Sequence, residues 1–134
     1  MIILGYDPGG EGNNGAAILR TSNTKGNAYQ VGTFDHADDT LDWFVEELKD
    51  QIPSAAGIDT LLNWLTGRKG WRPQDDWLER NCAECFRDRL DKRLNSIKCS
   101  FELFGCMSVQ GMAMANRLRD YWPSIHLNEA CLSG

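Results

Sequence analysis

Two aspartates stand at the ends of apolar segments that are typical of buried strands. Asp7 follows the run Ile2–Tyr6, and Asp59 lies near the end of Ala55–Thr60. If these strands are parallel neighbours, both carboxylates emerge at the sheet edge where open α/β sheets bind ligands. Two close carboxylates repel each other unless a cation lies between them, and Mg²⁺ or Mn²⁺ suits such oxygen ligands. We therefore expect a metal site that activates water and stabilises the charge on a transferring phosphoryl group.

Glu129 is the third candidate, because it follows the last expected strand, Ser124–Asn128. Asp7, Asp59 and Glu129 are thus the candidate catalytic residues and the candidate metal ligands. A plainer interpretation stays open for Asp7. The sequence Asp-Pro-Gly is itself a turn former, and an aspartate that ends a strand often only begins the turn.

A basic cluster follows the second aspartate. Arg68, Lys69 and Arg72 are interleaved with Trp64 and Trp71 in a segment that its glycines and proline mark as a loop. The three basic residues are the candidate substrate-binding residues, which would hold phosphates while a tryptophan stacks on a base. The alternative is a solvated loop whose tryptophans cover the core, since tryptophan is highly buried on average.

Four cysteines offer a second kind of metal site. Cys82 and Cys85 form a Cys-x-x-Cys pair, with Cys99 and Cys106 farther along the chain. Four thiolates suit structural zinc, but the pair falls on the apolar stripe of an expected helix, where buried free cysteine is common. The five cysteines are an odd number, so at least one lacks an internal partner, which favours a reducing compartment.

The spacing of apolar residues changes along the chain, from the pattern of strands to the pattern of a helix. Three strands joined by short turns come first and predict an antiparallel meander: Ile2–Tyr6, Ala16–Arg20 and Ala28–Phe34. Apolar residues at helical spacing follow, namely Leu41, Phe44, Val45, Leu48 and Ile52. Asp39 or Thr40 would cap this helix, and Pro53 would end it.

A strand within Ala55–Thr60, ending at Asp59, comes next and is expected to run parallel to an earlier strand, because a helix connects them. Two helices, Asp75–Leu94 and Met107–Trp122, and the strand Ser124–Asn128 complete the pattern. The predicted fold is α/β, with a mixed five-stranded sheet. Three strands are antiparallel, the last two are parallel to the first, and helices cover both faces.

The composition suits one globular domain spanning residues 1–134, with 42% hydrophobic and 25% charged residues. No apolar run approaches the roughly 20 residues that cross a bilayer, and no basic leader opens the chain. We therefore expect a cytoplasmic protein with no membrane contact. The net charge of −5 is uneven, with −7 over residues 1–62 and +3 over residues 63–98. Such a chain is a poor general nucleic-acid binder, but a metal and a local basic stretch are compatible with phosphodiester chemistry.

Several segments resemble the ribonuclease-H-like superfamily. Ile3–Gly10, followed by Gly15–Leu19, is similar to its first hairpin, and its Holliday-junction resolvases carry a similar Gly-x-Asp-Pro-Gly segment. Three further segments resemble a narrower group, the uncharacterised domains predicted to be ribonuclease-H-like nucleases: Ala56–Asp59, Arg72–Leu78 and Met107–Met112.

The resemblance implies a nuclease that depends on Mg²⁺ or Mn²⁺ and acts on nucleic acid. The aspartates on strands one and four of that family match Asp7 and Asp59. Glu129 matches the family's glutamate in part, because Ala130 and Cys131 follow it where relatives carry His-Pro. The chain ends shortly after Glu129, where relatives continue into further helices, so the resemblance implies a C-terminally truncated member.

Two other functions stay open. The chain can be an inactive ribonuclease-H-like module that binds nucleic acid or another protein. The Asp-Pro-Gly-Gly hairpin also resembles the phosphate loop of actin-like and sugar-kinase ATPases, in which Gly9 and Gly10 would let backbone amides approach a phosphate. Those ATPases need a second lobe to enclose the nucleotide, for which 134 residues leave no room.

Overall fold

The computed structural model describes residues 1–9, 12–22, 24, 26–60, 62 and 103–130. The chain divides into two compact units, one formed by Met1–Leu62 with Met107–Gly134 and the other by Asn63–Cys106. The sheet and the core belong to the first unit. The expected helix Asp75–Leu94 lies outside the described residues, and the assignment of residues 1–134 to one domain stays a prediction.

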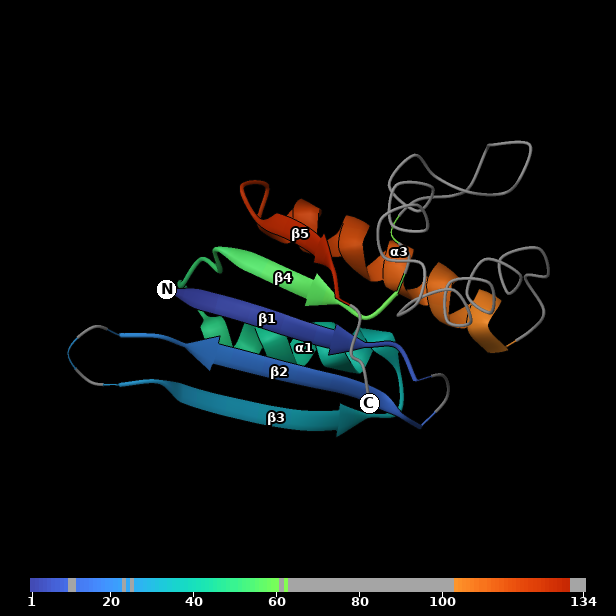
Figure 1. Cartoon of the computed structure of the whole chain (residues 1–134), viewed down its shortest axis with the longest axis horizontal. Coiled ribbons are helices and arrows are strands. Elements are labelled where there is room, and N and C mark those ends of the chain that lie inside the picture. The colour runs from blue at the N-terminus through green and yellow to red at the C-terminus, as the bar shows by residue number, and fades with distance from the viewer. Residues whose placement is uncertain (10–11, 23, 25, 61, 63–102, 131–134) are drawn as a thin grey trace, which may run out of the picture. The chain divides into compact units, whose positions relative to one another are not determined.

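Five strands form one mixed sheet in the order β3-β2-β1-β4-β5 (Figure 1). The strands are β1 (Ile2–Asp7), β2 (Asn14–Arg20), β3 (Ala28–Phe34), β4 (Ala55–Ile58) and β5 (His126–Glu129). β2 pairs antiparallel with both β1 and β3, whereas β4 pairs parallel with β1, and β5 parallel with β4. The predicted α/β fold, with three antiparallel strands and then parallel ones, is confirmed.

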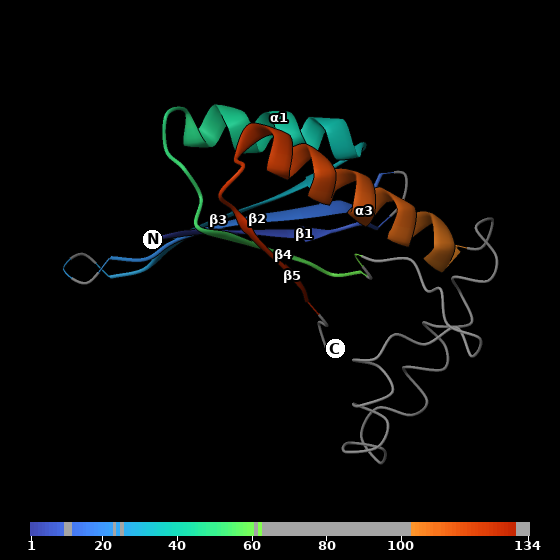
Figure 2. The same cartoon turned by 90° about the horizontal axis from the view of Figure 1, so that it is seen from above.

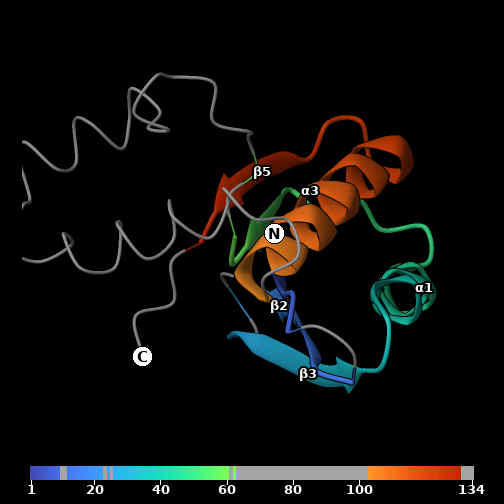
Figure 3. The ribbon, with the colours of Figure 1, turned by 90° about the vertical axis from the view of Figure 1, so that its right-hand side faces the viewer.

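The two described helices, α1 (Ala37–Leu48) and α3 (Leu103–Tyr121), both lie on one face of the sheet (Figure 2, Figure 3). Alternate residues of the three central strands are buried on that face: Leu4, Tyr6, Ala16, Ile18, Ala56 and Ile58. They form one core with buried side chains of the helices: Leu41, Phe44, Leu48, Met114, Ala115 and Leu118. The expected placement of helices on both faces stays a prediction, because the helix expected over Asp75–Leu94 lies outside the described residues.

Helix α1 is shorter than predicted at its C-terminus. It ends at Leu48, because Lys49 takes a positive φ of 52° and its N–H donates to the carbonyl of Val45. Ile52 therefore lies beyond the helix and is 65% exposed, so the prediction that Pro53 ends the helix is wrong. The backbone turns away a full helical turn before the proline is reached.

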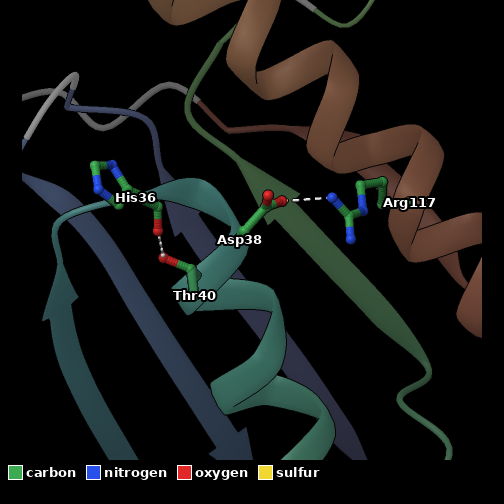
Figure 4. Close-up of polar contacts among 4 residues, drawn as sticks. All are labelled: His36, Asp38, Thr40 and Arg117. Carbon is green, nitrogen blue, oxygen red and sulfur yellow. Dashed lines mark hydrogen bonds and ion pairs between the residues drawn. The ribbon is translucent and has the colours of Figure 1, made fainter.

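The N-terminus of α1 also differs from the prediction. His36, rather than Asp39 or Thr40, precedes the helix with an extended backbone. Thr40 instead lies inside the first turn, where its hydroxyl donates to the carbonyl of His36 over 3.3 Å (Figure 4). In the same view Asp38 pairs with Arg117 of α3, so an ion pair joins the two helices at this end.

Helix α3 packs closely against the end of β4. The hydroxyl of Thr60 donates to that of Ser108 over 3.2 Å, and both side chains are buried. At Gly111, one turn farther along α3, an added Cβ would lie 1.9 Å from Cγ2 of Thr60. Only glycine lets the helix approach so closely. This contact fixes the backbone directly after Asp59.

The loop between β1 and β2 is held by Asn14, which is fully buried at the start of β2. The Tyr6 hydroxyl donates to Oδ1 of Asn14 over 2.7 Å. Nδ2 of Asn14 donates to the carbonyl of Asp35 over 3.1 Å, and the Gly12 N–H donates to the same carbonyl over 3.0 Å. The Asn14 side chain therefore connects β1 to the entry to α1, and the glycine-rich loop bonds to the same Asp35 carbonyl through its backbone.

Replacement of Asn14 with alanine is expected to destabilise the protein by about 1–3 kcal/mol, because it leaves buried polar groups such as the Tyr6 hydroxyl without this partner. Tyr6→Phe removes that hydroxyl, so the double variant should lose less free energy of unfolding than the sum of the two single variants. Urea denaturation of the four proteins measures this coupling. Strictly additive losses would show that the Tyr6–Asn14 bond contributes nothing.

Candidate functional site

Asp7 and Asp59 emerge from neighbouring strand ends. Asp7 is the last residue of β1, and Asp59 directly follows β4. The parallel register pairs Tyr6 with Ile58, and the Asp59 N–H donates to the Tyr6 carbonyl over 2.9 Å. Asp7 and Asp59 thus follow the last paired residues of β1 and β4, and they lie side by side at the carboxyl edge of the two strands.

The two carboxylates interact electrostatically. Partial desolvation, and then the negative charge of Asp59, raise the pKa of the Asp7 carboxyl above its ordinary value. Both effects disfavour the charged form of Asp7. A bound cation would reverse the repulsion, because it favours both ionised carboxylates.

Tyr6 lies beneath the pair and plays a different part. Burial, and then the charge of Asp7, raise the pKa of the Tyr6 hydroxyl to about 12. The hydroxyl therefore keeps its proton at neutral pH and remains a donor to Asn14. Tyr6 supports the loop after Asp7 and is a poor candidate for proton transfer.

Glu129, the last residue of β5, lies at the same sheet edge but in a different position. It pairs in register with Ile58, the residue before Asp59. Because side chains alternate along a strand, the Glu129 side chain starts on the face opposite that of Asp59. Its Oε1 accepts a hydrogen bond from the N–H of Leu62 over 2.8 Å. Glu129 therefore holds the segment that follows Asp59.

Within the described ranges, no group of three His, Cys, Asp or Glu side chains gathers to hold a metal ion. Asp7 and Asp59 offer two carboxylates. This number fits Mg²⁺, which usually keeps several waters and binds through one or two carboxylates together with substrate phosphates. The donor chemistry thus suits a hard divalent cation without a third protein ligand.

A shallow pocket of about 320 Å³ adjoins the two aspartates. Its lining is almost entirely apolar and is built of small residues from β1, β2, β4 and the residue after β5, chiefly Gly5, Gly15, Ala17, Gly57 and Ala130. The pocket lets a flat or extended group come close to the backbone beside the carboxylates.

Asp7→Asn is expected to raise the melting temperature at pH 7 without divalent metal, by about 2 °C or less, because solvent screens much of the repulsion at this exposed group. The pKa of Asp7 is raised in the folded state. Its contribution is therefore most favourable below the pKa of the unfolded chain and is lost as the pH rises through the folded-state pKa. The advantage of asparagine should thus fade near pH 3.

Glu46→Gln is the control for this measurement, since it removes one negative charge from an exposed position of α1. Melting temperatures of the wild type and both variants at pH 7 and pH 3 test the prediction. A gain for Glu46→Gln as large as that for Asp7→Asn would mean that net charge, and not the carboxylate pair, causes the effect.

Sequence reasoning did not identify Asn14, Thr60 and Ser108, although they hold the segments on either side of the aspartates. A buried asparagine or threonine has no signature in one sequence, because only the fold shows which backbone group it meets. The predicted phosphate contacts Arg68, Lys69 and Arg72 lie outside the described residues, as does the Cys82–Cys85 pair. No helix among the described residues is long and apolar enough to cross a membrane.

Comparison with known proteins adds no family to this picture. No protein-family profile, no curated protein and no solved structure matches the chain significantly. The fold and the carboxylate pair are therefore the observations on which a function is argued.

Proposed function

We propose that the chain is a nuclease of ribonuclease-H-like type, which hydrolyses phosphodiester bonds of nucleic acid with Mg²⁺ or Mn²⁺. The observation that carries the proposal is the pair Asp7 and Asp59 at adjacent carboxyl ends of parallel strands. When bound, the metal would supply a polarised water and offset charge on the phosphoryl group. Ligands of open α/β sheets bind at this edge, so the pair is well placed to meet a substrate.

The chain's own residues have separate tasks in this proposal. Asp7 and Asp59 provide the carboxylate oxygens. Glu129 positions the backbone after Asp59 through its bond to the Leu62 N–H, and Thr60 joins the same segment to Ser108 of α3. Both anchors belong to regular elements, α3 and β5, and so position the segment that follows Asp59.

The direct test is a cleavage assay on single-stranded, duplex and branched DNA and RNA, with and without millimolar Mg²⁺ or Mn²⁺. The proposal expects cleavage of at least one of these substrates, only with metal. Metal should also raise the melting temperature of the wild type by mass action, and Asp7→Asn should lose that rise. ATP binding without cleavage of any nucleic acid would favour the nucleotide-binding alternative instead.

Arg68, Lys69 and Arg72 are proposed to hold substrate phosphates. Each lost phosphate contact should flatten the log–log salt dependence of binding by about 0.7–0.9. The triple alanine variant is therefore expected to bind nucleic acid with a salt slope that is smaller by about two to three units. An unchanged slope would show that these side chains do not touch the phosphates.

A second candidate is an inactive module that binds nucleic acid or protein. The observation that favours it is the position of Glu129, whose side chain starts on the face opposite Asp59 and accepts a hydrogen bond from the Leu62 N–H. Binding of nucleic acid with no cleavage under any metal would support this candidate over the nuclease.

A further inference from the structure

One face of the sheet carries neither of the described helices, and we call it the open face. Side chains alternate across each strand, and the register places Tyr29, Val31 and Thr33 of β3 on this face, beside Leu19, Ala17 and Gly15 of β2. In β1, Ile3, Gly5 and Asp7 occupy the same face. Helices α1 and α3 pack on the other face (Figure 3).

Two large apolar side chains stand out from this face. Tyr29 is 77% exposed and Val31 is 70% exposed, although both lie within a regular strand. An exposed aromatic ring on a sheet is a stacking platform that every nucleic-acid base can use, since every base has a π-face. Tyr29 therefore offers a contact that depends on a base, in addition to any contact with phosphate.

The path from Tyr29 to the aspartates crosses small residues of the described strands. Tyr29 is four residues along β3 from Thr33, which lies level with Asp7, and β3 is two strands from β1. At ordinary strand dimensions the two positions are roughly 16 Å apart. Gly5 and Ala17 lie between them, at the floor of the pocket beside the carboxylates. Val31 of β3 and Leu19 of β2 flank this route.

The charges on the open face agree with this path. On the described strands its charged positions are Asp7 and, directly after β4, Asp59. A divalent ion held by that pair would offset their charge, so the phosphates of a bound strand would meet no other negative side chain of the described strands along the route. A double helix would keep its bases stacked on one another, whereas a single strand can present a base face to Tyr29.

We propose that the open face receives a single strand of nucleic acid and that Tyr29 stacks on a base a few nucleotides from the phosphate at Asp7 and Asp59. This inference rests on the proposed nuclease function and adds the substrate form and a residue that binds it.

The test is the affinity of the full chain for two fluorescent decamers, oligothymidylate and an abasic strand with the same phosphates, measured by anisotropy. Ca²⁺ is present throughout, because it takes the same oxygen ligands as Mg²⁺. Tyr29→Ala should bind oligothymidylate about 5- to 150-fold more weakly than the wild type. Its affinity for the abasic strand should stay within about twofold of wild type, because phosphate contacts remain.

Two further variants make the result specific. Tyr29→Phe keeps the ring and should bind like the wild type. Tyr121→Ala is the matched control, because Tyr121 is 51% exposed at the end of α3, away from the open face. Since Tyr29 is so exposed, its substitution should leave the melting temperature unchanged, and that measurement accompanies the binding data.

The outcomes separate this inference from the function on which it rests. Equal binding of oligothymidylate by wild type and Tyr29→Ala overturns the stacking role and leaves the nuclease proposal intact. Equal affinity of the wild type for the two decamers does the same. A wild type that binds neither decamer and cleaves no nucleic acid overturns the proposed function and this inference together.

Discussion

Asp59→Asn is expected to reduce metal-dependent cleavage by more than about 100-fold. The substitution keeps the size of the side chain and removes one of the two charges that would bind the ion. Loss of a residue that only hydrogen-bonds to a metal ligand typically costs 10–100-fold in metal affinity or activity. Loss of a direct ligand should cost at least as much. Initial rates under single-turnover conditions, across a range of Mn²⁺ concentrations, measure the effect.

The matched control is Asp50→Asn, which removes the same charge from an exposed turn after α1. It should cleave at the wild-type rate. If high Mn²⁺ restores most of the activity of Asp59→Asn, the residue contributes to metal affinity alone. A cleavage rate for Asp59→Asn equal to that of Asp50→Asn would contradict a catalytic site at this edge.

Gly111→Ala is expected to destabilise the protein by about 2–3 kcal/mol. In most helices this change would stabilise, because alanine has a better helix propensity by about 1 kcal/mol. Here the new Cβ would lie 1.9 Å from Cγ2 of buried Thr60 and 3.3 Å from Cγ2 of Ile58. Overpacking of this kind in a well-packed core costs about 1–3 kcal/mol, and occasionally more.

Thr60→Ser provides the rescue, since it removes the clashing Cγ2 and keeps a hydroxyl for Ser108. The double variant should therefore be more stable than Gly111→Ala alone. Ala113→Gly, at an exposed position of α3, gives the baseline for helix propensity without the contact. Chemical denaturation measures the free energy of unfolding of the wild type and of each of these variants. A Gly111→Ala variant as stable as the wild type would contradict the close approach of α3 to β4.

The strands were the most predictable part of the fold. The apolar run before Asp7 and the alternation over Ala28–Phe34 are local patterns, and each corresponds to a strand of the structure. The parallel pairing of β4 with β1 followed from the helix between them. Element ends were less predictable, because they depend on single backbone conformations such as the positive φ of Lys49.

In the candidate site, too, some features can be inferred from the sequence and others cannot. Asp7 and Asp59 are neighbours because strand ends and parallel register bring them together, and both can be inferred from the pattern. The contact of Glu129 with Leu62 depends on where a flexible side chain meets a loop backbone, which spacing does not encode. The same holds for Asn14, whose side chain bonds to Tyr6 of β1 and to the carbonyl of Asp35 after β3.

The reason for a glycine in the loop after Asp7 is visible only in the folded structure. At Gly9 a Cβ would lie 2.0 Å from the carbonyl oxygen of Asn13. The loop's own backbone therefore requires glycine at this position. This packing explains Gly9 without a bound phosphate, so the Asp-Pro-Gly-Gly sequence alone does not favour an ATPase over a nuclease.

The central claim is that Asp7 and Asp59 share a divalent cation, and crystals soaked in Mn²⁺ test it most directly. The account predicts an anomalous peak between the two carboxylates, about 2.0–2.2 Å from an oxygen of each, as expected for a small divalent ion with oxygen ligands. The peak should be absent from crystals of Asp7→Asn soaked in the same way. A wild-type map with no peak at this edge, or a peak that persists unchanged in Asp7→Asn, would contradict the claim.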